Sequence, residues 1–467
     1  MARPGGGVDR VYDVAMPIRR APRTARLGPA LNALLALLRH RFATGIGLSL
    51  LAVPAIAGLS RLVGLLREAL LSKMLGLGAG LDLFVIFTTV PTYALAYMMG
   101  PFGIAFYASL NGAQITAQGL WRRLLPWTLG SGLFIGVLVF IAAAIYEPRV
   151  RLAEGAVAGY WPVAVGGAAI VPIAVLIGMG ICLLHAEKKH STAISLSVAQ
   201  PWIFVALLLG LDLLLLSVAL WPVGLAYVGS FLVALLIAAV LLRRSLSVPS
   251  APRGADELAV FKGHLGLTTL ETGGFFANQL LTMFFAGLTG AGGIAANGLV
   301  ARIMLTPLSL MLSPLSPVLQ NACRDKTPAA RRRIFRRSYA GGLASIALLA
   351  AAIVVFGDDI VRLLLQRGAF GPEDTARVAA LLLPYGLYVI FIAVNQLCAV
   401  SAFIGGDGKA YTYTMLGNYL CSNLLKIPMV THYGLSGVIW AAAASEGVAA
   451  VINSWRQLAP AKAADPS

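Results

Sequence analysis

Within Ser60-Arg61-Leu62-Val63-Gly64-Leu65-Leu66-Arg67-Glu68, two arginines and one glutamate interrupt the first long apolar run of the chain. A guanidinium group in hydrocarbon costs roughly 2.5–3.5 kcal/mol on insertion scales, so charged residues at such positions usually have a function. An anionic group that has to enter the bilayer would account for this cost. The stretch therefore predicts a membrane protein that carries an anionic ligand.

Most of the chain is apolar. Of its 467 residues, 58% are hydrophobic and 12% are charged, and its mean hydropathy is +0.82. These values are typical of polytopic membrane proteins. The four cysteines lie far apart with neither metal-ligand spacing nor a paired framework, so we interpret them as packing residues. The net charge of +17 is explained by membrane topology rather than by nucleic-acid binding, because the basic residues lie between apolar segments.

We predict twelve membrane-spanning helices, since a span needs about 20 apolar residues. The candidate ranges are 44–75, 81–110, 124–146, 158–185, 191–211, 217–242, 264–288, 292–322, 339–365, 376–403, 410–427 and 433–455. If the N-terminus is cytoplasmic, the segments on that side hold 26 of the 36 Lys and Arg residues, as the positive-inside rule requires. We therefore expect an all-α multi-pass protein with both termini in the cytoplasm.

The first 43 residues carry eight arginines and have no apolar segment of the kind found in a secretory signal. We interpret residues 1–43 as a basic cytoplasmic tail. Leu31, Leu34, Leu35, Leu38 and Phe42 repeat at helical spacing, which fits a helix lying on an anionic lipid surface. A frayed beginning of the first span is the alternative.

The chain also resembles itself at a spacing of six spans. Gly76-Leu77-Gly78-Ala79-Gly80 before the second span parallels Gly287-Leu288-Thr289-Gly290-Ala291-Gly292 before the eighth. Two halves of like orientation are expected to place a binding site between them, as in alternating-access carriers. This predicts an N-lobe at 44–242, a cytoplasmic linker at 243–263, a C-lobe at 264–455 and a C-terminal tail at 456–467.

Three arginines are the candidate ligand contacts. Arg61 and Glu68 are seven residues apart and share one helix face, with Gly64 between them, whereas Arg67 points about 120° away. Arg302 lies within the eighth span and has no acidic neighbour in sequence. Because guanidinium groups bind phosphate oxygens in a bidentate manner, these arginines suit a diphosphate. The alternative is an Arg–Glu pair that holds helices together.

Three further acidic residues in the predicted spans are candidates for a functional or structural role. Glu271 in the seventh span is a candidate for taking up a proton or a sodium ion. Glu446 in the twelfth span carries the same two interpretations, ion coupling or structure. Asp82 opens the second span after a glycine-rich turn, where a helix N-cap is the favoured role.

No metal site, cofactor motif or enzymatic motif is apparent in the sequence. The five histidines are scattered, and no Walker motif is present. We therefore predict a transporter rather than an enzyme. The alternatives are a cation or multidrug exporter of the same architecture, a scaffold without transport, and a polysaccharide polymerase or ligase with its chemistry in the external segment 356–376.

The stretch Ser60–Glu68 followed by Gly78-Ala79-Gly80-Leu81-Asp82-Leu83-Phe84 resembles the opening signature of the MurJ/MviN lipid II flippases, which belong to the multidrug/oligosaccharidyl-lipid/polysaccharide exporter superfamily. The resemblance continues at Ala301–Met304 and Leu363–Phe370. It implies a two-lobed bundle in the bacterial inner membrane, in which Arg61, Arg67 and Arg302 bind the diphosphate of an undecaprenyl-linked saccharide.

Two departures from that family concern the substrate. The stretch after Pro91 has no charged residue where the family carries an arginine pair, and the family's two further C-terminal helices are not found in this sequence. We therefore keep three substrate types open, namely precursors of exopolysaccharide, of O-antigen and of the lipid II type.

Overall fold

Every secondary-structure element in the described part of the chain is helical. The computed structural model describes residues 46–110, 116–154, 159–214, 219–246, 256–323, 328–405 and 407–458. Residues 52–467 form one unit, and its arrangement is described here. The predicted tail 1–43 with its interfacial helix lies outside the described residues, as do the middle of the linker (247–255) and most of the C-terminal tail (459–467).

The helices follow the predicted apolar segments, and each predicted range overlaps at least one of them. Their bounds are α2 (Ile46–Leu75), α3 (Ala79–Tyr97), η1 (Met98–Phe102, a π-helical segment), α4 (Gly103–Leu110), α5 (Ala117–Glu154), α6 (Tyr160–Ala186), α7 (His190–Leu214), α8 (Leu220–Leu246), α9 (Asp256–Gly287), α10 (Gly293–Cys323), α11 (Pro328–Val355), α12 (Gly357–Leu365), α13 (Pro372–Ala379), α14 (Leu382–Gly405) and α15 (Gly408–Leu458).

Eight of the described helices are long and apolar enough to cross a membrane. The chain is therefore a multi-pass membrane protein with an all-helical fold. The count of twelve crossings, the division into two lobes and the cytoplasmic side of the termini stay predictions.

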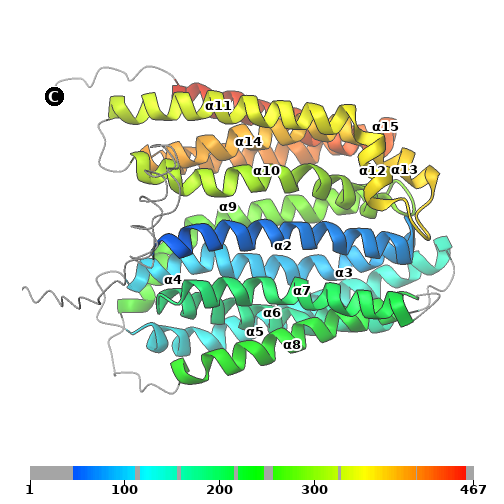
Figure 1. The fold of residues 1–467 in the computed structure, drawn as a ribbon, viewed down its shortest axis with the longest axis horizontal. Coiled ribbons are helices and arrows are strands. Elements are labelled where there is room, and N and C mark those ends of the chain that lie inside the picture. Colours follow the sequence, from blue (N-terminus) through cyan, green and yellow to red (C-terminus); the bar gives the residue numbers. More distant parts are fainter. Residues whose placement is uncertain are drawn as a thin grey trace, which may run out of the picture. The chain divides into compact units, whose positions relative to one another are not determined.

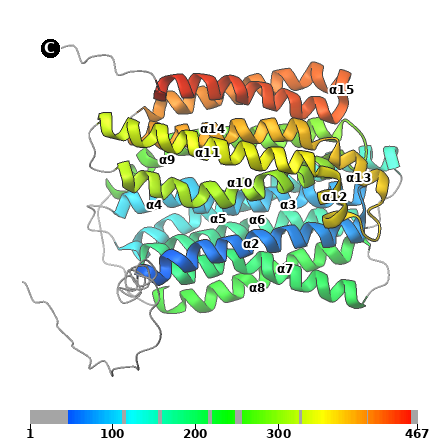
Figure 2. The ribbon, with the colours of Figure 1, turned by 45° about the horizontal axis from the view of Figure 1, so that its top comes forward.

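The long helices run side by side (Figures 1 and 2). Among the first group, α6 packs against α3, α5, α7 and α8. Among the second group, α14 packs against α10, α11 and α15, and α15 also packs against α9. In both views α5–α8 lie on one side and α11, α14 and α15 on the other, and in Figure 1 α2 and α3 are seen between them. Contacts of α3 with α10 and of α4 with α9 join the two groups.

The outer helices expose their large apolar side chains. On α5 these include Phe134, Val137 and Ile141, and on α8 they include Leu232 and Leu236. Such surfaces are favourable against lipid and unfavourable against water. Inside, helices approach closely where residues are small: a Cβ atom on Gly136 of α5 would lie 2.7 Å from the Ala168 carbonyl oxygen of α6.

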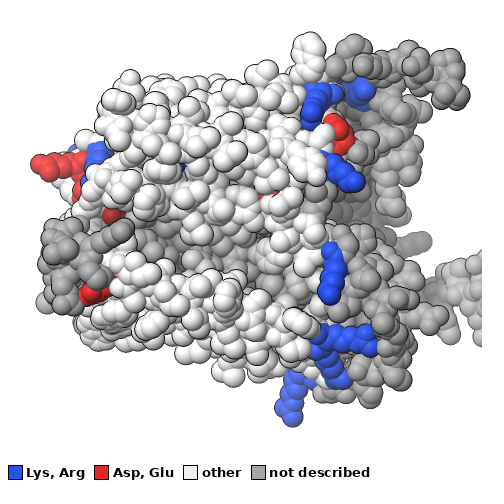
Figure 3. Space-filling view, turned by 180° about the vertical axis from the view of Figure 1, so that it is seen from behind, with Lys and Arg blue, Asp and Glu red and all other residues white. Residues whose placement is uncertain are grey.

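Charged side chains gather at the two ends of the bundle, with most of the visible Lys and Arg side chains at one end (Figure 3). At the basic end, the Glu187 carboxylate accepts three hydrogen bonds of 2.6–2.7 Å. The donors are Gln118 of α5, Lys189 of the turn between α6 and α7, and Ser245 of α8. Burial pushes the pKa of Glu187 upward, but these hydrogen bonds outweigh burial and leave that pKa below its usual value. At the opposite end, α12 and α13 carry Asp358, Asp359, Glu373 and Asp374.

Gly434 divides α15 into two helices. Gly434 has φ 57° and ψ −138°, a conformation that reverses the chain between the two halves of α15. An open space surrounds it, because no described atom lies within 4 Å of the position a Cβ would take. The predicted boundary between the eleventh and twelfth spans, at 428–432, lies two residues before this glycine.

The Gly434→Ala variant is expected to lower the melting temperature of the purified protein, because its only defect is backbone strain of about 1–3 kcal/mol. The control is Gly417→Ala in the same element, where the backbone is helical and a Cβ also meets open space. Thermal unfolding in detergent measures both variants. Equal melting temperatures would contradict the glycine requirement at position 434.

Candidate functional site: a shared carboxyl group between two arginines

The first and eighth predicted spans meet at Glu68. Its Oε1 atom accepts hydrogen bonds from Nε of Arg67 at 2.8 Å and lies 2.6 Å from Nη1 of Arg302. Arg67 and Glu68 lie on α2, whereas Arg302 comes from α10. The carboxyl group is buried, with a side-chain exposure of 6%. One acidic side chain therefore joins two helices through two guanidinium groups.

This cluster keeps a positive charge. Two guanidinium groups face one carboxyl group, so at least one charge stays uncompensated within the cluster. The side chain of Arg302 is 40% exposed and that of Arg67 is 17% exposed. Each guanidinium has five N–H donors, of which Glu68 uses only a part. The arrangement can accept a further anion from the exposed side.

The structure corrects one expectation for Arg302. The sequence shows no acidic neighbour for this residue, but the fold places Glu68 of α2 in ion-pair contact with it. The pairing of Arg67 with Glu68, which was the alternative to a ligand contact, is present as well. Sequence spacing along α10 could not reveal a partner that comes from another helix.

Arg61 lies two turns before Glu68 and is exposed. No hydrogen bond or ion pair joins it to another residue in the described part of the chain. Beside Gly64, no described atom lies within 4 Å of the position a Cβ would take. Gly64 therefore faces open space rather than allowing a close helix contact.

Asp82 caps a different helix from the one expected. Its Oδ2 accepts a hydrogen bond from the Gly292 amide at 2.7 Å, and its Oδ1 accepts one from the Ala295 amide at 2.6 Å. These amides belong to the beginning of α10, whereas α3 begins without a side-chain cap. The carboxylate thus satisfies backbone donors at an α10 terminus that also favours negative charge. The prediction that Asp82 caps its own helix is wrong, because the adjacent helix offers two amides.

The last turn of α2 is held by contacts with two other segments of the chain. The Lys73 carbonyl accepts a hydrogen bond of 2.9 Å from the Ala369 amide, and the Lys73 ammonium forms a 2.7 Å ion pair with Asp212 of α7. Gly76, at φ 65°, would place a Cβ 2.9 Å from the Ala369 carbonyl oxygen. The segments that follow α2 and α12 are therefore in direct contact.

Glu271 and Glu446 have different surroundings. Glu271 on α9 is partly buried, and none of the described residues forms a hydrogen bond or ion pair with it. Glu446 on α15 is buried and accepts hydrogen bonds from the Asn395 amide at 2.9 Å and the Asn418 amide at 2.5 Å. Asn453 in turn donates to Asn395 at 2.9 Å. This network supports a structural role for Glu446.

The sequence analysis missed one buried cation. Lys426 is not among the residues singled out from the sequence, but its side chain is fully buried, at 0% exposure. Its partners are Asn278, Thr282 and Asn423. The spacings Asn278–Thr282 and Asn423–Lys426 on two helices could have indicated a polar contact.

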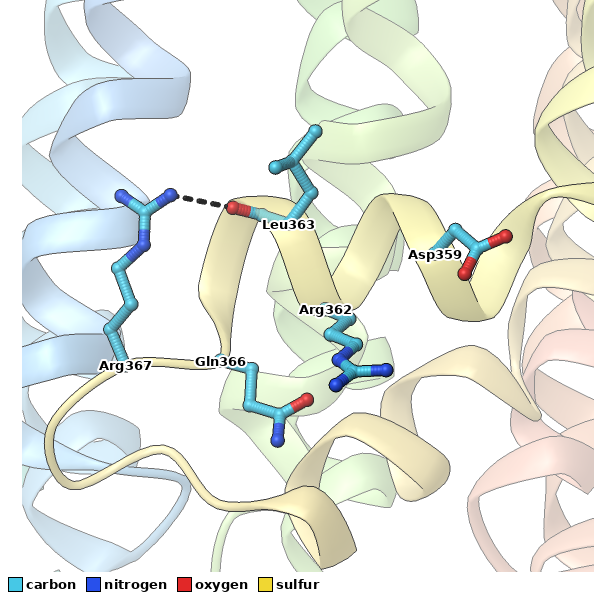
Figure 4. A pocket seen from close by; sticks show the side chains of 5 residues that line it. All are labelled: Asp359, Arg362, Leu363, Gln366 and Arg367. Carbon is cyan, nitrogen blue, oxygen red and sulfur yellow. Dashed lines mark hydrogen bonds between the residues drawn. The ribbon is translucent and has the colours of Figure 1, made fainter.

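A separate pocket of about 450 Å³ lies at the acidic end of the bundle, in the segment expected to be external (Figure 4). It is lined by Asp359, Arg362, Leu363, Gln366 and Arg367. Arg367 donates to the Leu363 carbonyl at 2.7 Å, which holds the segment after α12. Within the described residues, no group of three His, Cys, Asp or Glu side chains could hold a metal ion.

The shared carboxyl group predicts strong coupling between Glu68 and Arg302. Glu68→Gln should lower the melting temperature more than Arg302→Gln, because it leaves two guanidinium groups together without a carboxylate. The double variant should recover part of the loss, with a coupling energy of about 0.5–3 kcal/mol. Thermal unfolding of the purified variants measures the cycle. Strictly additive effects would show that the two residues do not interact.

Loss of the Asp82 cap should also be measurable. Asp82→Ala is expected to cost about 0.5–2 kcal/mol of stability, and Asp82→Asn less, because the amide keeps one acceptor. Asp212→Ala serves as the control, since its ion pair with Lys73 is partly exposed and should contribute only about 0–1 kcal/mol. A wild-type melting temperature for Asp82→Ala would show that the carboxylate does not stabilise the beginning of α10.

Two related proteins match this chain over most of its length. A probable lipid II flippase MurJ from Synechocystis sp. is 26% identical over 430 residues, which cover 83% of this chain and 77% of the relative. A second probable lipid II flippase MurJ, from Rhizobium meliloti, is 27% identical over 374 residues, which cover 74% of this chain and 67% of the relative.

Two solved structures share the fold. The lipid II flippase MurJ in an inward closed conformation matches with a TM-score of 0.71 and 16% identity, over 87% of each chain. An inward-facing multidrug resistance MATE-family transporter of the MOP superfamily matches with a TM-score of 0.70 and 16% identity, over 87% of this chain and 96% of that one. The family model described as "Lipid II flippase MurJ" matches residues 168–465, which is more than half of the chain. This protein therefore belongs to the MurJ lipid II flippase family.

Proposed function

We propose that this chain is a flippase that moves a polyprenyl-diphosphate-linked saccharide from the inner to the outer leaflet of a bacterial inner membrane. The observation that carries the proposal is the Arg67–Glu68–Arg302 cluster, which keeps a positive charge within two largely apolar helices. Bidentate guanidinium–phosphate contacts would offset the cost of moving a diphosphate out of water. The names of the relatives support a transporter of a lipid-linked precursor rather than an enzyme.

In this proposal each residue of the cluster has its own role. Arg302, the more exposed of the two paired arginines, contacts the diphosphate first, and Arg67 assists. Glu68 holds both guanidinium groups in place, so that little side-chain freedom is lost when the ligand binds. Arg61 and the open space beside Gly64 provide a path for the head group along α2.

The transport step is proposed to be alternating access between an N-lobe (44–242) and a C-lobe (264–455), with both termini in the cytoplasm and twelve crossings. The packing of α5–α8 around one another and of α14 with α10, α11 and α15 supports two lobes. The hydrogen bonds of Asp82 to α10 and of Ala369 to Lys73 would then keep the external end closed. The lipid tail stays in the bilayer, and only the head group crosses.

Three finer points belong to the same proposal. Lipid II is the first substrate to test, because the relatives are named for it; exopolysaccharide and O-antigen precursors follow. Glu271 is the candidate for proton or sodium coupling, since it lies within α9 without a described partner. The basic tail is proposed to contact anionic lipid.

The alternative of a cation exporter is less well supported. The likeness to a MATE transporter concerns the fold alone, and the positive charge of the Arg67–Glu68–Arg302 cluster argues against a cationic substrate.

Flipping by the arginine variants tests the proposal. In proteoliposomes, Arg302→Ala is expected to slow the appearance of labelled polyprenyl-diphosphate saccharide in the opposite leaflet by about tenfold or more, because a charge-assisted hydrogen bond contributes about 1.5–3 kcal/mol. Arg302→Lys should recover only part of the rate, since an ammonium cannot bind phosphate as a fork. Arg61→Ala should show a loss in the same direction.

The matched control is Arg337→Ala, which removes an exposed arginine of α11 at the basic end of the bundle. This variant should flip at the wild-type rate. Normal flipping by both Arg61→Ala and Arg302→Ala would remove the proposed anion site. A substrate series of lipid II, an O-antigen precursor and an exopolysaccharide precursor then identifies the saccharide.

A further inference from the structure

Lys426 is a charged side chain that the proposed flipping mechanism does not use. It lies within the first half of α15, two residues before Pro428, and has no exposed surface. A fully buried ammonium in a membrane helix is costly unless hydrogen bonds or an opposite charge compensate it. Its surroundings therefore need an explanation.

Three oxygen atoms surround the ammonium group. Nζ donates to Asn278 Oδ1 at 3.0 Å, to Thr282 Oγ1 at 2.7 Å and to Asn423 Oδ1 at 3.1 Å. Asn278 and Thr282 come from α9, and Asn423 comes from α15. An ammonium group has three N–H donors, so each donor has one acceptor. A neutral amine would leave one of these oxygens without a donor.

Two of these oxygens are held in position by hydrogen bonds within their own helices. The Thr282 hydroxyl donates to the Asn278 carbonyl at 2.7 Å, which leaves its lone pairs for the ammonium. The Asn423 amide nitrogen donates to the Tyr419 carbonyl at 2.8 Å, which turns its oxygen toward Lys426. Two of the three acceptors, on Thr282 and Asn423, are thus positioned by hydrogen bonds within their own helices as well as by Lys426.

No carboxylate completes this site in the described part of the chain, since no ion pair includes Lys426. On α9 the nearest acidic residue in sequence is Glu271, seven residues before Asn278 and therefore about 10 Å away along the helix axis. On α15 the carboxyl group of Glu446 is bound by Asn395 and Asn418, and α14 contains no charged residue. Neutral oxygens alone surround one positive charge.

We infer that Asn278, Thr282 and Asn423 form a binding pocket for a monovalent cation, which the ammonium group of Lys426 fills permanently. Three neutral oxygens from amide and hydroxyl groups suit a hard monovalent cation as well as an ammonium ion. Because the cation is tethered to α15, it clamps α9 to α15 without a dissociable ion. The pocket lies among residues of α9 and α15 only, so the inference does not depend on the proposed flippase activity.

Chemical rescue of Lys426→Ala tests this inference. The truncated side chain should leave the pocket vacant and lower the melting temperature in choline chloride by about 2 °C or more. Methylammonium chloride at the same ionic strength should restore part of the loss, because its ammonium group can reoccupy the pocket. Sodium or potassium chloride should restore part of it as well. Wild type should melt at one temperature in all four salts.

Two controls make the result specific. Lys409→Ala removes an exposed lysine of the same element and should show no salt-dependent shift. Tetramethylammonium, which has no N–H donor, should not rescue Lys426→Ala. Identical melting temperatures of Lys426→Ala in every salt would overturn the pocket, and so would a Lys426→Met variant as stable as wild type.

If Lys426→Ala does not fold, Thr282→Val gives a second measurement. This variant keeps the lysine and removes one of its three acceptors, so its melting temperature should fall. Thr431→Val is its control, because that exposed hydroxyl only donates to the Pro428 carbonyl. Equal stability of the two valine variants would overturn the role of Thr282 in the pocket.

Discussion

Two guanidinium groups that share one buried carboxyl group are the constraint on which this structure depends. Glu68 can be buried between α2 and α10 only because Arg67 and Arg302 both contact it. Its presence in turn lets two arginines lie side by side within apolar helices at a tolerable cost. The remaining positive charge has no partner inside the cluster. That residual charge is what gives the helix pair its chemical function in the proposed mechanism.

The same helix pair is tied at one end by backbone contacts. Asp82 caps α10 from α3, and Ala369 binds the last turn of α2. These are polar contacts between segments that are more than two hundred residues apart in sequence. Polar junctions of this kind can form and break with less cost than a continuous apolar interface, because water can replace each partner. They are therefore suited to an end that closes and opens.

Much of the fold could be predicted from the sequence, because a membrane span needs a long apolar segment and the turns between spans are rich in glycine. Gly434 marks the boundary within α15, and Pro372 opens α13. The candidate site was predictable only in part. An arginine in an apolar run is visible in sequence, but the partner of Arg302 comes from a different helix, as do the amides that bind Asp82. The burial of Lys426 could not be predicted from its position near the end of the predicted span 410–427, because two of its three oxygen partners come from another helix, α9.

Protection of the arginines by ligand tests the central claim most directly. Phenylglyoxal modifies accessible guanidinium groups, and peptide mass spectrometry of the purified protein can report the extent of labelling at Arg61, Arg67 and Arg302 separately. Undecaprenyl diphosphate should reduce labelling of Arg302 and Arg61, whereas undecaprenol, which has no phosphate, should not. Exposed Arg337 should label equally throughout. Equal labelling of Arg302 and Arg61 with and without the diphosphate would contradict an anion site on α2 and α10.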